Sequence, residues 1–100
     1  MRRDPKRRPT HPGELLREDV LPDAGLTQTE LALQMGVSRL TVSEIVHEKR
    51  AVSADIAHRL GRVFGNGPEL WLNMQKAVDL WDAEQANRHV YAKIKPLQAA

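Results

Sequence analysis

The chain contains no cysteine, only four aromatic residues and no long apolar run. Without cysteine it has no disulfide framework, no thiol nucleophile and no zinc site built from thiolates. A membrane span needs roughly 20 apolar residues, and no run approaches that length, so we expect a soluble protein with no membrane contact. The basic start lacks the apolar stretch of a secretory signal, and a cysteine-free chain suits the reducing cytoplasm, which we predict as its location.

The sequence also lacks the spacings that mark catalytic and metal sites. There is no HExxH pair, no serine elbow and no glycine-rich phosphate loop. Asp55 and His58 fall within one helical turn, an arrangement more typical of a surface contact than of a catalytic pair. We therefore predict no enzyme activity, no metal and no cofactor. RNA binding is disfavoured because the aromatic residues are too few for a base-stacking platform.

The charge is unevenly distributed. The formal net charge is +2, but five cations against Asp4 give +4 within the first eight residues, so the remaining chain sums to −2. Residues 1–10 hold charges and two prolines with almost nothing apolar, which predicts a disordered, mobile basic arm. Such an arm can follow DNA, order against a protein partner, or act only as a solubilising tail.

Apolar spacing and end signals predict an all-α fold of five helices. The first is expected to begin at Pro12 and to stop before Pro22. The second follows a capping box, Thr27 with Glu30, and ends at Gly36.

Three further helices follow Gly36. Ser38 is predicted to cap a third helix, over about 38–47, and Ser53 a fourth. Pro68 opens a long fifth helix to about Asn87, which the segment "RHVYAKIKPLQAA" could extend until Pro96. We divide the chain into an arm (1–10), a domain (11–87) and a C-terminal extension (88–100).

The second and third helices form a helix-turn-helix pattern. About three residues around Gly36 join them, so the angle is sharp, Val37 must fill the gap, and Ala32 must stay small. If Val42 and its apolar neighbours face the core, a polar face is left to enter a DNA major groove. That face comprises Arg39, Leu40, Ser43, Glu44 and His47.

Chemistry suggests a role for each candidate DNA-binding residue. Arg39 can bind guanine O6 and N7 with both arms of its guanidinium group, and Leu40 can touch a thymine methyl. The hydroxyls of Ser38, Thr41 and Ser43 can reach a phosphate or a base edge. Contacts to the DNA backbone are expected from the start of the second helix, through Gln28 and Thr29, and from beyond the third, through Lys49 and Arg50. His47, on the outward face, is a further candidate for DNA binding. Glu44 must accept from cytosine, pair with Arg39 or reject wrong sequences.

Three segments together resemble the HigA-type antitoxins, within the larger group of phage-repressor-like (lambda-repressor-like) helix-turn-helix proteins. They are "HPGELLREDVL", "LTQTELALQMGVSRLTVSEIVHEKR" and "ELWLNMQKAVDLW", and the resemblance covers roughly residues 11–82. It implies a homodimer that binds the operator of its own toxin–antitoxin operon and silences a small RelE-like messenger-RNA endonuclease. A stand-alone repressor without a toxin is the alternative, which the neighbouring gene would distinguish.

The resemblance assigns Ser38, Arg39, Thr41 and Ser43 to the recognition segment and Gln28 to a phosphate contact. The chain departs from the family at the end of the third helix. Where the family often has Asn-Gly before Lys-Arg, this chain has His47-Glu48, which changes how the helix ends.

The fifth helix is apolar over more than one face, which calls for burial on several sides. A second subunit would supply it, and a two-fold dimer is also what reading two half-sites requires. We predict a homodimer whose interface includes Leu70, Trp71, Met74, Val78 and Trp81. The simpler alternative is that this stripe only covers the other four helices.

Overall fold

The computed structural model describes residues 6–97, which form five helical stretches and no strand. The first stretch is continuous and runs through Pro12–Leu15 (α1), a π-helical turn Leu16–Val20 (η1) and Leu21–Ala24 (α2). The others are α3 (Gln28–Met35), α4 (Arg39–Val46), α5 (Ala54–Phe64) and α6 (Pro68–Tyr91). The all-α prediction is confirmed.

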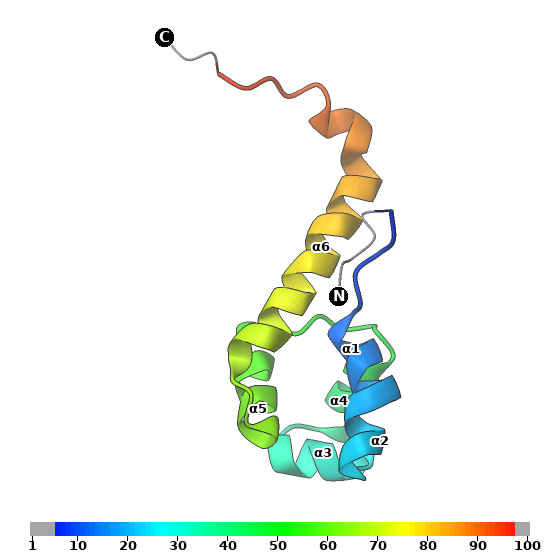
Figure 1. The fold of residues 1–100 in the computed structure, drawn as a ribbon, viewed down its shortest axis with the longest axis vertical. Helices are drawn as coiled ribbons and strands as arrows, with labels where there is room; N and C mark the ends of the chain where they lie inside the picture. The colour runs from blue at the N-terminus through cyan, green and yellow to red at the C-terminus, as the bar shows by residue number, and fades with distance from the viewer. Residues whose placement is uncertain (1–5, 98–100) are drawn as a thin grey trace.

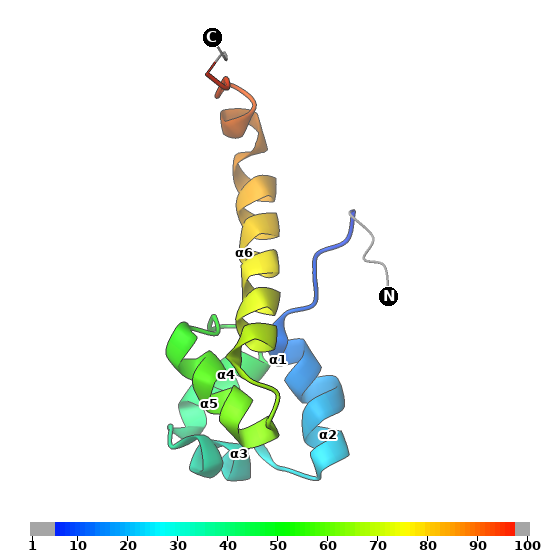
Figure 2. The same ribbon diagram turned by 60° about the vertical axis from the view of Figure 1, so that its left-hand side comes forward.

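The helices α1 to α5 form a packed body at one end of the molecule, and α6 extends away from this body (Figures 1 and 2). The shape is therefore elongated, with extents of 55 × 27 × 26 Å. The first turns of α6 pack on α5, whereas its far end projects away from the body.

The core lies inside the body and is made by one apolar face from each helix. Its fully buried side chains include Leu16, Leu31, Ile45, Leu60 and Trp71. The Trp71 ring lies 5.9 Å from that of Phe64, and its indole N–H donates to the Asn66 side chain at 3.0 Å. A buried indole with a satisfied donor anchors the start of α6 to the body.

The predicted end signals of α3 and the predicted caps of α4 and α5 lie where they were expected. Thr27 Oγ1 accepts from the Glu30 amide at 3.1 Å, and the Glu30 carboxylate accepts from the Thr27 amide at 3.0 Å. Gly36 ends α3 with a φ of 72°, a left-handed conformation that favours glycine. Ser38 and Ser53 cap α4 and α5 through their hydroxyls.

The predicted end of the first helix before Pro22 is wrong. The helix continues through Pro22 and ends at Gly25, whose φ is 67°. The widened π turn before it explains the difference, because the Leu21 amide donates to the Leu16 carbonyl. A new α-helical segment begins at Leu21, so Pro22 lies in its first turn, where proline is tolerated.

The end of α6 lies between the two predicted limits, Asn87 and Pro96. Asn87 leaves helical geometry (φ −127°, ψ 19°), and its side-chain amide donates to the Ala83 carbonyl at 3.1 Å. The helix nevertheless resumes and continues to Tyr91. Asn87 is therefore a kink rather than a terminus.

The predicted mobile arm differs from the structure at its inner end, residues 1–5 lying outside the described range. Pro9 is buried against the body, and the Arg8 guanidinium group bonds to Asp82 of α6. The partner of Arg8 lies 74 positions away, so no local pattern could have revealed it.

Gly13 permits the closest approach of α1 to α4. A Cβ at Gly13 would overlap the backbone carbonyl oxygen of Ile45, which cannot move without shifting α4. We expect Gly13→Ala to lower the free energy of unfolding by about 3 kcal/mol, as overpacking of a core does. Gly25→Ala is the control, because its Cβ would meet nothing and only the left-handed backbone is penalised, by about 1 kcal/mol. Urea unfolding measures both, and equal losses would contradict the close approach.

His11 caps α1 and is buried. Its Nδ1 accepts from the Gly13 amide at 2.9 Å, which requires the ring to be neutral at that nitrogen. Burial, and then the positive charge of Arg8, lower the pKa of His11, while Glu48, Asp79 and Asp82 oppose the shift. Between the lowered pKa and the ordinary value the unfolded chain binds more protons than the folded one. Stability from this group is therefore complete above about pH 6.5 and is lost as the pH falls through the lowered pKa.

We expect His11→Asn to remove this part of the pH dependence, because asparagine is also a good N-cap but does not titrate. Urea unfolding of both proteins at several pH values between 5 and 8 measures it. The wild type should lose more stability than the variant on acidification. The same slope in both proteins would assign the acid sensitivity to other groups.

Candidate nucleic-acid interface

The turn between α3 and α4 is held in place by side-chain hydrogen bonds from α5. Val37 is half-buried against the core, as predicted, and Arg59 of α5 donates to the carbonyls of Met35 at 2.8 Å and Gly36 at 3.3 Å. Asp55 accepts from Arg59 Nε at 3.0 Å and steadies it. Arg59 was not predicted to support the turn, because nothing in its local sequence pattern distinguishes it from the other arginines.

The α4 helix has one buried and one outward face. Val42, Ile45 and Val46 are at most 1% exposed, so they seat the helix firmly in the core. On the other side Arg39 and His47 are exposed and Leu40 is 67% exposed. Ser43 and Glu44 are half-buried at its edge. The polar outer face predicted from the sequence is therefore present.

Two hydroxyls at the start of α4 are partly committed to the fold. Ser38 Oγ accepts from the Thr41 amide at 3.1 Å and lies 2.9 Å from Thr41 Oγ1. One hydroxyl hydrogen is shared between the two oxygens, which leaves the pair able to offer a second hydrogen to an acceptor such as a phosphate. The cap and the candidate contact thus use the same atoms.

The partner of Glu44 is Arg50, not Arg39. Arg50 donates to Glu44 Oε1 from Nε at 3.0 Å and from Nη2 at 2.7 Å. This pairing offsets a carboxylate that would otherwise repel a polyanion. It also leaves the Arg39 side chain exposed on the outer face.

The remaining predicted contacts lie around the two ends of the motif. His47 Nδ1 lies 2.7 Å from the Ser43 carbonyl and 3.4 Å from the Ser43 hydroxyl, which folds the ring back over α4. Lys49 is exposed just beyond it. Thr29 is exposed and Gln28 half-buried in the first turn of α3, where free amides favour an anion.

The segment just after α4 makes contacts that were not predicted from the sequence. Glu48 has a φ of 61°, the left-handed region that usually calls for glycine. Its carboxylate contacts two arginines, Arg8 at 3.3 Å and Arg17 at 3.4 Å, and Arg17 also donates to the Val46 carbonyl. The one signal in the sequence was Glu48 itself, which stands where the family resemblance led us to expect glycine.

The predicted dimer residues do not all reach the surface. Trp71 and Val78 are 0% and 1% exposed, because they pack inside the protomer, so their surfaces are not available to a second subunit. Leu70 is exposed, and Met74 and Trp81 are half-buried. An apolar hollow further along α6 is lined by Ala77, Leu80, Trp81 and Glu84, and Leu80 there is 73% exposed.

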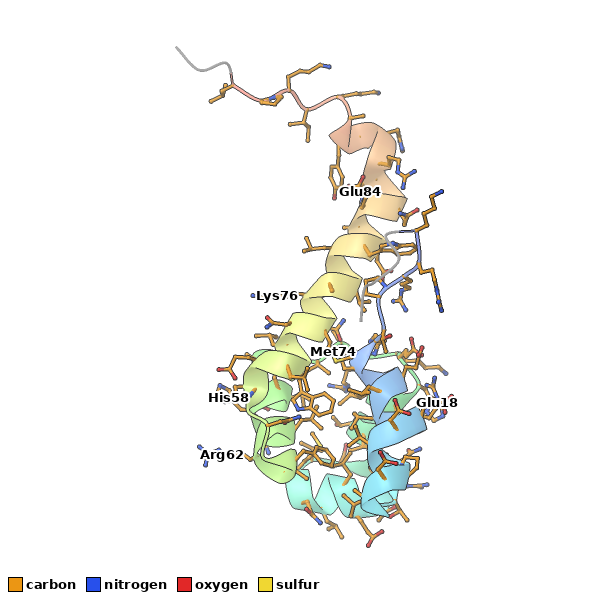
Figure 3. The ribbon with its side chains drawn as sticks, in the orientation of Figure 1. Glu18, His58, Arg62, Met74, Lys76 and Glu84 are labelled. Carbon is orange, nitrogen blue, oxygen red and sulfur yellow. The ribbon has the colours of Figure 1, made fainter. Side chains whose placement is uncertain are left out.

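Several polar side chains outside this region face solvent. His58, Arg62 and Lys76 point outward on the α5–α6 side of the body, opposite Glu18 (Figure 3). Asp55 is paired with Arg59 rather than with His58. Within residues 6–97 no three acidic or histidine side chains gather as metal ligands. Over the same range, no helix is both long and apolar enough to cross a membrane.

A short helix, a left-handed glycine turn and a second helix with an exposed polar face define a helix-turn-helix protein. A family model described as "Helix-turn-helix" matches residues 16–72. Antitoxin HigA-1 of Vibrio cholerae serotype O1 is 42% identical over 95% of this chain and 90% of its own length. The chain belongs to the HigA antitoxins of the helix-turn-helix group, which are regulators and not enzymes.

Solved structures agree with this assignment. Pseudomonas aeruginosa antitoxin HigA with the higBA promoter matches at a TM-score of 0.85 and 41% identity, over 91% of this chain and 100% of that chain. Antitoxin GraA in complex with its operator also matches at a TM-score of 0.85, with 39% identity, over 98% of this chain and 100% of that chain.

Proposed function

We propose that the protein is an antitoxin that binds the operator of its own operon and represses it, with α4 as the recognition helix. The observation that carries the proposal is the exposed face of α4, seated rigidly by Val42, Ile45 and Val46. Relatives with the same fold have been solved with promoter or operator DNA, which supports the proposal. A chain acting on an operator works in the cytoplasm.

Each side chain receives a role from its place on this surface. Arg39 reads guanine and Leu40 touches a thymine methyl. Ser38, Thr41 and Ser43 supply hydroxyls near the leading end of α4. Contacts to phosphates come from both ends of the motif, through Gln28, Thr29, His47, Lys49 and Arg50.

We further propose that the protein acts as a homodimer. A two-fold dimer presents two recognition helices to half-sites one helical turn apart. The hollow of Ala77, Leu80, Trp81 and Glu84 gives α6 an apolar surface for a second copy, next to the exposed Leu70 and the half-buried Met74. Trp71 and Val78 support this surface from within the protomer.

The second partner that we propose is a RelE-like messenger-RNA endonuclease, which the antitoxin silences. Support comes from the membership of the chain in the HigA antitoxins. This proposal is separate from DNA reading, since α4 looks the same in an antitoxin and in a stand-alone repressor.

Arg39→Ala tests the reading of DNA. We expect the wild type to prefer its own upstream DNA over a shuffled duplex by about 4 kcal/mol or more, and the variant to lose about 1–3 kcal/mol of that preference. Fluorescence anisotropy near physiological salt measures both duplexes. Equal binding of the wild type to the two duplexes would leave only attraction to the DNA backbone and would reject the operator function.

Leu80→Glu tests the dimer surface. Sedimentation equilibrium at micromolar concentration should give the mass of two chains for the wild type and of one chain for the variant, because a buried carboxylate is strongly penalised. Leu33→Glu on α3 is the matched control, since Leu33 is 77% exposed and lies outside the hollow, and it should stay dimeric. A wild-type mass of one chain would reject the homodimer.

A further inference from the structure

The inner part of the N-terminal arm runs along the same side of the body as α6 (Figures 1 and 2). Arg8 donates to both carboxylate oxygens of Asp82, from Nε and from Nη2, each at 2.8 Å. Two parallel bonds of this kind fix orientation as well as distance. The third nitrogen of the same guanidinium group reaches Glu48 Oε1 at 3.3 Å. One side chain thus joins α6 to Glu48, two positions beyond the last residue of the recognition helix.

Glu48 is held in a conformation that its own backbone disfavours. Its φ of 61° brings Cβ close to the following carbonyl, a penalty that glycine escapes. The carboxylate compensates by accepting from Arg8 on one oxygen and from Arg17 on the other. Its amide donates to the Ile45 carbonyl at 2.9 Å, and the Lys49 amide donates to the Glu44 carbonyl at 2.7 Å. The chain therefore leaves α4 along one defined path.

That path decides where two candidate phosphate contacts lie. Lys49 and Arg50 follow Glu48 directly, and Arg50 is held beside α4 through Glu44. A change in the backbone at Glu48 would redirect both cations. The geometry of this segment is consequently linked through Arg8 to the position of α6.

The charges argue against a direct DNA contact by Arg8. Its guanidinium group lies between two carboxylates, so most of its charge is already offset locally. The bond from Arg8 holds the pKa of the Asp82 carboxyl below its ordinary value, so the pair stays ionised at neutral pH. Arg7, one position earlier, is exposed and has no such partner among the described residues.

We propose that Arg8, with Asp82 and Glu48, is a positioning residue for operator binding: the arm acts as a strap that fixes the Lys49–Arg50 segment against α6 without touching DNA. The proposal rests on the operator function proposed above. Exposed ion pairs are individually weak, so the strap sets the local geometry of one segment and contributes little to global stability.

Arg8→Gln and Arg7→Gln form a matched pair, since each removes one positive charge from adjacent exposed positions. We expect Arg8→Gln to weaken operator binding by about twofold to fivefold and Arg7→Gln to leave it nearly unchanged. Fluorescence anisotropy on the upstream DNA measures both. Equal losses in the two variants would show that the arm acts only through its charge, and would overturn the proposal.

Asp82→Asn separates positioning from electrostatics by the sign of its effect. The substitution removes a negative charge and frees Arg8. If Arg8 touched DNA directly, or if the arm acted only through its positive charge, DNA binding would become tighter. The strap predicts weaker binding, by about the same factor as for Arg8→Gln. The double variant R8Q/D82N restores the wild-type net charge, yet the strap predicts that it binds as weakly as the single variants. Tighter binding by Asp82→Asn, or wild-type binding by the double variant, would overturn the proposal.

Amide hydrogen exchange tests the strap without DNA. The Glu48 and Lys49 amides should exchange faster in Arg8→Gln and Asp82→Asn than in Arg7→Gln, while core amides such as that of Leu60 remain unchanged. Unchanged exchange at Glu48 and Lys49 would reject the strap. If the wild type shows no preference for its upstream DNA but exchange responds as expected, the operator function fails and the strap stands as a property of the fold.

Discussion

The architecture depends on how closely α1 approaches the backbone of α4. At Gly13 the two helices are so near that a single methyl group would collide with the carbonyl of Ile45. This approach allows Val42, Ile45 and Val46 to be fully buried, which fixes the rotation of α4 about its own axis. The opposite face, with Arg39 and Leu40, is then necessarily outward. The recognition surface is therefore a consequence of core packing on the far side of the same helix.

Polar contacts fix the two ends of this helix where apolar packing cannot. At its start, Ser38 caps the helix and Arg59 holds the preceding turn through two carbonyls. At its end, Arg17 satisfies the Val46 carbonyl and supports Glu48 in a left-handed conformation. The cap and each of these hydrogen bonds contribute on the order of 1 kcal/mol to overall stability. They matter because they set the orientation of α4, and reading DNA requires several of its side chains to point toward the bases together.

The differences from the predictions have two kinds of cause. Pro22 was expected to stop a helix, but a local π turn, closed by Leu21 on Leu16, lets the helix continue. The arm was expected to be mobile, but Arg8 bonds to Asp82 across the fold. Trp71 and Val78 were assigned to a dimer surface, but they are buried within the protomer. For Arg8, Trp71 and Val78 the outcome depends on packing between segments that are distant in the sequence.

The sequence by itself determined the capped helix starts, the glycine turn and the two-faced character of α4, because capping and apolar periodicity act over three or four residues. It also identified most residues of the candidate DNA surface, since those follow from the side of α4 that is not apolar. Only the tertiary structure decided that Glu44 pairs with Arg50, that Arg59 supports the turn, and that Arg8 and Arg17 converge on Glu48. Such contacts join residues from different helices, and their existence depends on how those helices pack in three dimensions.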